Sequence, residues 1–244
     1  ARSRTIVPHR VPRMHAPRAV LAAALTVLAL AGCQPRAADA PAAKPVVIGL
    51  SLDTVREERW QRDRDQFVAH AESLGAKVLV QVANNDDARQ NAQAENLLTQ
   101  GVDVLVVAPH NSESAATIVA AAHRAGVPVI AYDRLINQAD LDLYISFDNF
   151  RVGEMQAEYA LAKKPKGNYV LIAGAPTDNN AHLYHEGQMK VLQPAIDRGD
   201  VRIVGDQWAN DWQPVEALKI MENALTRNGN RVAAVVGSND GLAA

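Results

Sequence analysis

The sequence predicts an α/β fold of two similar lobes, each a doubly wound parallel sheet. Short runs rich in Val, Ile and Leu alternate with polar segments of helical length. Gly75, Gly101 and Gly126 stand where three successive helices should end, as left-handed C-terminal cap residues do. The same rhythm restarts after a crossing segment, residues 141–148. Right-handed crossovers would then place helices on both faces of each sheet.

The first predicted lobe spans residues 45–140, and its helices follow the strands in a regular order. Asn85 or Asp86 can cap the second helix, because a short polar side chain there accepts a backbone N–H. The predicted strands are 46–52, 77–83, 102–108 and 127–132, and the helices end near 74, 101 and 124, the third beginning at 112.

The second predicted lobe spans residues 149–244 and repeats the pattern. Its predicted helices are 149–163, 180–196 and 214–226, and its strands are 168–173, 201–208 and 232–237. Residues 238–242 have the pattern of a helix N-terminus, and three strands match the four of the first lobe poorly. We therefore expect this lobe to be truncated at its C-terminus.

The first 32 residues have the pattern of an export signal. A basic, acid-free stretch precedes an apolar run, residues 19–31, that is short for a membrane span. Met14 could be the true start, with residues 1–13 lying upstream of it. The run ends in Leu-Ala-Gly-Cys, which resembles the bacterial lipoprotein cleavage box, so Cys33 is expected to be lipidated and residues 33–44 to form a flexible tether. The alternative is an unmodified cysteine in an uncleaved segment.

Composition and missing motifs exclude several classes of protein. A net charge of −2 gives no reason to expect a nucleic-acid partner, and one cysteine allows no intramolecular disulfide. The strand-to-helix turns lack the glycine patterns of nucleotide sites, so no cofactor is expected. Residues 237–241 lack the spacing of a nucleophile elbow, and His182 and His185 lack a third zinc ligand. No enzymatic constellation is therefore predicted.

Asp133 and Arg134 form the strongest candidate site, since they follow an apolar strand where it leaves the sheet. Ligands gather at the carboxyl ends of strands in open α/β sheets. A carboxylate beside a guanidinium group suits a polyol, because Asp133 accepts hydroxyl hydrogens and would repel an anion. The alternative is a surface ion pair. Further polar and aromatic residues follow other strands: Arg56, Arg59, Trp60, Asp178, Asn179, Asn180, Trp208, Trp212, Asn239 and Asp240.

Two indoles together with Asn, Asp and Arg side chains are typical of a sugar site. Taken singly, Asn180 and Asn239 could merely cap helices, and Trp208 is expected to be a core residue. Trp60 and Trp212 stand at helix starts among polar neighbours, where burial in a core is less expected.

Four motifs carry a resemblance to a known family: ERWQRDRD at 58–65, YDRLINQAD at 132–140, YISFDN at 144–149 and GDQWANDW at 205–212. They resemble the D-xylose-binding branch of the ribose/galactose-binding periplasmic proteins, and the similarity runs from about Lys44 to the last residue. The resemblance implies the type I periplasmic-binding-protein fold, with two lobes joined by a hinge. It also implies a receptor that captures D-xylose between the lobes and delivers it to the permease subunits of an ABC importer, without cofactor or covalent chemistry.

Matched position by position, the resemblance implies that Trp60 and Trp212 sandwich the sugar. Hydrogen bonds to its hydroxyls would come from Arg59, Asp133, Arg134, Asn180 and Asn239, with Arg56 and Asn179 as further candidates. Alternatives are a receptor for ribose or galactose, a chemotaxis sensor with a chemoreceptor partner, or the effector domain of a repressor. The export signal occupies the place of a repressor's DNA-binding helices. The best-known members of the family are freely soluble after signal cleavage, whereas Cys33 here implies a periplasmic protein anchored to a membrane by a lipid.

Overall fold

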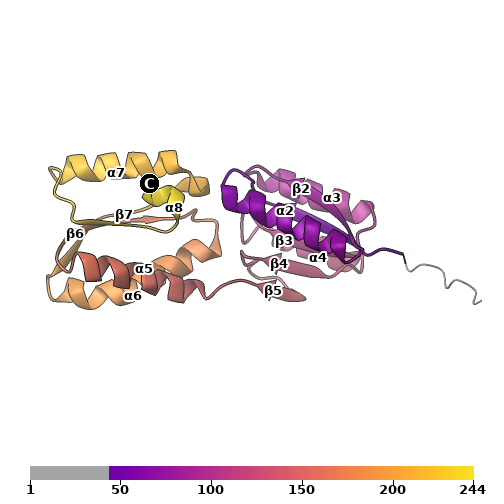
Figure 1. The fold of residues 1–244 in the computed structure, drawn as a ribbon, viewed down its shortest axis with the longest axis horizontal. Coiled ribbons are helices and arrows are strands. Elements are labelled where there is room, and N and C mark those ends of the chain that lie inside the picture. Colours follow the sequence, from indigo (N-terminus) through magenta and orange to yellow (C-terminus); the bar gives the residue numbers. More distant parts are fainter. Residues whose placement is uncertain (1–43) are drawn as a thin grey trace, which may run out of the picture. The chain divides into compact units, whose positions relative to one another are not determined.

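The computed structural model describes residues 44–244 (Figure 1). The predicted export signal, Cys33 and the tether up to residue 43 lie outside the described residues. The strands are β1 Val47–Leu52, β2 Lys77–Val82, β3 Val104–Ala108, β4 Val129–Tyr132, β5 Leu143–Ile145, β6 Gly167–Ala173, β7 Val201–Trp208 and β8 Ala234–Gly237. The helices are α2 Glu58–Ser73, α3 Asp87–Thr99, α4 Ala116–Arg124, α5 Asn149–Lys163, α6 Asn179–Asp197, η1 Asn210–Trp212, α7 Pro214–Arg227 and α8 Asp240–Ala243.

The first sheet is parallel throughout, in the order β2-β1-β3-β4-β5. Helices α3 and α4 bury their apolar side chains against one face, around Leu97, Leu105 and Ile118. Helix α2 packs against the other face, around Leu52 and Trp60. The predicted helix stops are confirmed, because Gly75, Gly101 and Gly126 have φ values of 83°, 76° and 72°. This arrangement brings the carboxyl ends of the strands to one edge.

The crossing segment contributes β5, a fifth strand of the first sheet that sequence reasoning treated only as an extended connection. Ile130 pairs with Leu143 and Tyr132 with Ile145, in parallel register with β4. The backbone N–H of Asp133 donates to the carbonyl of Ile145 over 2.8 Å. The candidate residue Asp133 is thereby tied to the chain that leads into the second lobe.

The second sheet has the order β7-β6-β8 and is also parallel. Helices α5 and α6 cover one face and α7 covers the other (Figure 1). Helices α5 and α6 cross with backbone against backbone. A Cβ atom added to Gly153 would lie 2.1 Å from the carbonyl oxygen of Tyr184, and one added to Gly187 would lie 2.1 Å from that of Phe150. Only glycine allows this approach.

Two local predictions need correction. The third helix begins at Ala116, not at residue 112, because Asn111 Oδ1 accepts the amides of Glu113 and Ser114 in a turn. The short helix η1 was not predicted. It contains Asp211 and Trp212 at φ values of 53° and 56°, a left-handed conformation that local sequence patterns do not signal for tryptophan.

The start of helix α3 confirms a local prediction, since Asp86 caps this helix by accepting the amide of Arg89 over 2.8 Å. Asn85 does not cap it. Across residues 44–244, the structure has no helix whose length and hydropathy would suit a membrane span.

Candidate functional site

A cavity of about 720 Å³ is lined by loops that follow strands of both sheets. It brings together seven of the predicted site residues: Arg59, Trp60, Asp133, Arg134, Asn180, Trp212 and Asn239. Arg56 and Asn179 do not line it. Arg56 is exposed and donates to Asn85 instead. Cavities of this size are typical of small-molecule sites.

Both predicted aromatic residues of the cavity are more buried than expected. Trp60 is 4% exposed and Trp212 is 7% exposed, and each belongs to the hydrophobic cluster of its own lobe. The expectation that they avoid the core is therefore wrong for this arrangement. Each indole both packs in the core and lines the cavity. The Arg59 guanidinium carbon lies 4.3 Å from the Trp60 ring centroid, within cation–π range.

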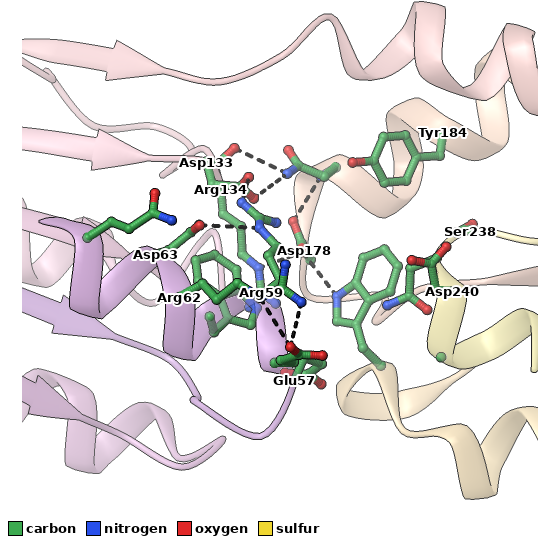
Figure 2. Close-up of a pocket in the computed structure, with 17 residues that line it drawn as sticks. Glu57, Arg59, Arg62, Asp63, Asp133, Arg134, Asp178, Tyr184, Ser238 and Asp240 are labelled. Atoms are coloured by element: carbon green, nitrogen blue, oxygen red, sulfur yellow. Dashed lines mark hydrogen bonds and ion pairs between the residues drawn. The ribbon is translucent and has the colours of Figure 1, made fainter.

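Asp133 lines the cavity and accepts hydrogen bonds from side chains of both lobes (Figure 2). It has a φ value of 65°, a left-handed conformation that aspartate tolerates because its short side chain bonds locally. Its Oδ2 atom accepts from Arg59, and its Oδ1 atom accepts from Asn180 Nδ2 over 3.2 Å. The surface ion-pair alternative does not describe this residue, because it is only 7% exposed.

Arg134 is 5% exposed and lies between two carboxylates, Asp53 of the first lobe and Asp178 of the second. Its Nη1 atom donates to Asp53 Oδ2 over 2.7 Å, and its Nε atom lies 2.9 Å from Asp178 Oδ2. Burial alone would lower the pKa of Arg134, but the nearby charges of Asp178 and Asp53 raise it. The guanidinium group is therefore a fixed cation at the floor of the cavity.

The helix-cap alternative for Asn180 is wrong. Asp178 caps α6 by accepting the Asn180 amide over 2.9 Å, which leaves the Asn180 side chain facing Asp133. For Asn239 the cap alternative holds, since its Oδ1 atom accepts the amide of Leu242 over 2.9 Å. Asn239 also lines the cavity, where its side-chain Nδ2 group is not used by the cap.

These strand-end residues line one cavity together with two indoles. The family model of the periplasmic binding protein domain matches residues 48–244. This chain belongs to the periplasmic binding protein family. The predicted two-lobed α/β fold is thereby confirmed, and the cavity lies where this fold presents the carboxyl ends of its strands.

Relatives within the periplasmic binding protein family include proteins named for a pentose. The chain is 56% identical over 200 residues to the D-xylose-binding periplasmic protein of Haemophilus influenzae, and 55% identical over 201 residues to that of Escherichia coli. The alignments cover 82% of this chain, and 60% and 61% of those two relatives. The chain thus spans about three fifths of the length of these relatives.

More distant members of the family bind other sugars. The multiple sugar-binding periplasmic receptor ChvE of Rhizobium radiobacter is 36% identical, with 89% of this chain and 66% of the relative covered. Among solved structures, an ABC transporter solute-binding protein from Clostridium phytofermentans with bound β-D-glucose is 31% identical. It superposes with a TM-score of 0.74, covering 80% of this chain and 65% of that one.

Several residues of the cavity were missed as binding candidates from sequence. Tyr184 lines it from the second turn of α6, a position that looks like an ordinary helix face. Asp53, which does not line the cavity, binds the guanidinium group of Arg134 and was also missed, whereas Asp178 was among the strand-end candidates and does line the cavity. The signal for Asp53 was available, because it follows the first buried strand just as Asp133 follows the fourth.

The charges that line the cavity are mainly negative. Six carboxylate residues face three arginines: Glu57, Glu58, Asp63, Asp133, Asp178 and Asp240 against Arg59, Arg62 and Arg134. A surplus of carboxylates repels anions and leaves hydroxyl hydrogens as the natural partners. Within residues 44–244, no group of histidine, cysteine and acidic side chains is arranged to hold a metal ion.

His110 joins the network from the loop after β3. Its Nδ1 atom lies 3.0 Å from Asp53 Oδ1, and its Nε2 atom lies 3.6 Å from Asp87 and 3.8 Å from Asp211. The nearby carboxylate of Asp53 raises the pKa of His110 above its usual 6.5, although burial acts in the opposite direction. The ring is therefore held in its charged form over a wider pH range.

This shift makes stability depend on pH. A raised pKa of His110 in the folded state stabilises the fold fully below the unfolded value, and the effect disappears as pH rises through the folded value. His110→Gln should therefore lower the free energy of unfolding more at about pH 6 than at about pH 9, in urea titrations. His70→Gln, at an exposed position of α2, is the matched control. Equal losses for His110→Gln at both pH values would contradict the assignment.

Trp208 lies outside the cavity and is half-buried, so its predicted core position is confirmed on one side only. The other side stacks against two histidines of α6, with ring centroids 4.6 Å from His182 and 5.6 Å from His185. His185 Nε2 lies 3.0 Å from Asp206, and this hydrogen bond raises the pKa of His185. The two histidines and Trp208 form an aromatic patch on the helix surface.

Proposed function

We propose that this chain is the ligand-binding part of a periplasmic receptor that captures D-xylose between its two lobes. The proposal rests on one observation: the same cavity is lined by two indoles and three polar side chains, Trp60, Trp212, Asp133, Arg134 and Asn180. The identity of 55–56% to proteins named for D-xylose favours this pentose. Delivery to the permease subunits of an ABC importer belongs to the same proposal.

The cavity can hold a sugar without covalent chemistry. A hydroxyl group both donates and accepts, so a ring hydroxyl can insert between Asp133 and its partners Arg59 and Asn180. The indoles of Trp60 and Trp212 offer apolar planes to the C–H faces of a pyranose. Contacts from both lobes to one ligand favour the arrangement in which the lobes approach each other.

A second candidate is a receptor with broader aldose specificity. Relatives at 36% identity from Rhizobium radiobacter and Azospirillum brasilense are named multiple sugar-binding proteins, and the Clostridium phytofermentans neighbour holds glucose. A pentose lacks the exocyclic carbon of a hexose, so the two candidates differ in whether glucose fits. A chemoreceptor would be a further partner for either candidate.

The proposal predicts a ranking of sugars in calorimetric titrations of the protein at its natural length. D-xylose should bind well ahead of ribose, because its equatorial hydroxyls leave both faces flat for the indoles. Trp60→Ala and Trp212→Ala should each weaken binding by roughly 1–3 kcal/mol, the scale of aromatic burial and stacking. Trp208→Ala is the control, since Trp208 lies outside the cavity. Preference for ribose, or indifference to both cavity substitutions, would refute the assignment.

We further propose that the mature protein is anchored through a lipidated Cys33. The support is the Leu-Ala-Gly-Cys sequence at the end of an apolar run. Several acyl chains anchor a protein stably, whereas one anchors it weakly. In cell fractionation, the protein should therefore remain with membranes, and Cys33→Ser should release it or block its processing. A Cys33→Ser protein that remains membrane-bound to the same extent would argue against this anchor.

A further inference from the structure

The carboxylate of Asp178 is bound to three donors from three separate segments, although it is only 2% exposed. Its Oδ2 atom lies 2.9 Å from Arg134 Nε and accepts from Trp212 Nε1 over 3.1 Å. Its Oδ1 atom accepts the backbone amide of Asn180 over 2.9 Å. Figure 2 shows the carboxylate of Asp178 close to Arg134, beside the other charged residues of the cavity.

These contacts leave Asp178 little capacity for a ligand. A carboxylate offers about four acceptor positions, and three are occupied by protein donors here. Burial raises the pKa of Asp178, and the charge of Arg134 together with the two N–H groups opposes that rise. Burying a carboxylate costs free energy, and the three donors offset this cost at residue 178.

The indole of Trp212 has few other ways to be oriented. Its backbone has a left-handed φ value of 56°. Its ring packs on Gly174 so closely that a Cβ atom added to this glycine would lie 2.1 Å from Cη2 of the indole. Tyr184 meets the ring edge-on, with centroids 6.3 Å apart. Packing thus confines the ring, and the single polar atom of the indole points at Asp178.

We propose that Asp178 is a positioning residue of the sugar site. Its carboxylate fixes the indole plane of Trp212 and the guanidinium group of Arg134 in one arrangement before ligand arrives. The indole of Trp212 in the second lobe and the guanidinium group of Arg134 in the first lobe are therefore held by the same carboxylate. The effect on affinity rests on the proposed sugar-binding function, whereas the fixed indole is a property of the sugar-free protein.

The substitution Asp178→Asn separates shape from charge. An amide keeps the volume and can still cap α6, but its NH2 group is a donor and cannot accept from Arg134 or Trp212. Whichever way the amide group is turned, at least one of the three donors, Arg134, Trp212 or the Asn180 backbone amide, is then left unpaired in a buried place. D-xylose affinity should fall about tenfold or more, the scale of a lost hydrogen bond to a charged group.

The spectroscopic test uses the indole N–H resonances in a ¹H–¹⁵N spectrum of the sugar-free protein at its natural length. The Trp212 resonance is assigned by its loss in Trp212→Phe. Asp178→Asn should move the Trp212 resonance upfield and leave that of Trp208 in place. Asp206→Asn is the matched control, because it removes a carboxylate of the same lobe that, among residues 44–244, binds only His185. The control should leave the Trp212 resonance and the affinity unchanged.

Each outcome decides the proposal. An unmoved Trp212 resonance in Asp178→Asn overturns it, even if affinity falls, because Asp178 would then touch the ligand directly. If Asp178→Asn does not fold, Trp212→Phe and Trp60→Phe provide the comparison. Both shorten a cavity aromatic, but only the first removes an indole bond to a carboxylate, so it should lose clearly more affinity. Equal losses overturn the proposal. A wild-type protein that binds no aldose refutes the proposed function and leaves the resonance test intact.

Discussion

Asp133→Asn should weaken sugar binding about tenfold to a hundredfold while the protein keeps its fold. Asparagine tolerates the left-handed backbone of residue 133, whose φ value is 65°, so no new strain arises. The substitution removes the negative charge to which Arg59 donates and to which the sugar hydroxyls would donate. Because residue 133 is only 7% exposed, water cannot replace these contacts. Losing a hydrogen bond to a charged group costs about 1.5–3 kcal/mol.

The control for this prediction is a true surface pair. Arg64 and Asp65 are 2.7 Å apart, and the Asp65 side chain is exposed, so Asp65→Asn should change neither affinity nor stability measurably. Calorimetric titration and thermal unfolding of both variants separate the alternatives. If Asp133→Asn resembled Asp65→Asn in both measurements, Asp133 would be a structural pair and not a ligand contact.

Gly153→Ala should destabilise the second lobe by about 1–3 kcal/mol or more. Replacing glycine by alanine inside a helix normally stabilises by roughly 0.5–1 kcal/mol. Here the added Cβ atom would lie 2.1 Å from the carbonyl oxygen of Tyr184, and a backbone atom cannot rotate away. Helices α5 and α6 must then separate, so the steric cost outweighs the gain in helix propensity. Gly187→Ala should act in the same way from the opposite helix.

Urea unfolding measures this effect, and Gly241→Ala provides the matched control. A Cβ atom at Gly241 would meet its nearest neighbour, Pro214, at an ordinary 3.5 Å, so alanine is tolerated there. A Gly153→Ala protein as stable as Gly241→Ala would show that the two helices do not touch as closely as the structure indicates.

Local sequence patterns predicted those parts of the fold and site that depend on chain-local physics. Alternation of apolar runs with capped helices identified the strands, and residues following a strand identified Asp133 and Arg134. The burial of Trp60 and Trp212 could not be predicted, because it depends on which segments from elsewhere cover each ring. Nor could the bond from Trp212 to Asp178, which joins residues 34 positions apart through an unpredicted left-handed turn.

The stack of Trp208 on His182 and His185 has a consequence for optical measurements. Imidazolium is an electron acceptor that quenches indole emission, so Trp208 should dim as the solution is acidified through the raised pKa of His185. That intensity change is unrelated to sugar, since Trp208 does not line the cavity. Intrinsic fluorescence therefore combines a proton signal with a ligand signal. In a Trp208→Phe variant, the remaining emission would come from the two cavity tryptophans, Trp60 and Trp212, without that proton signal.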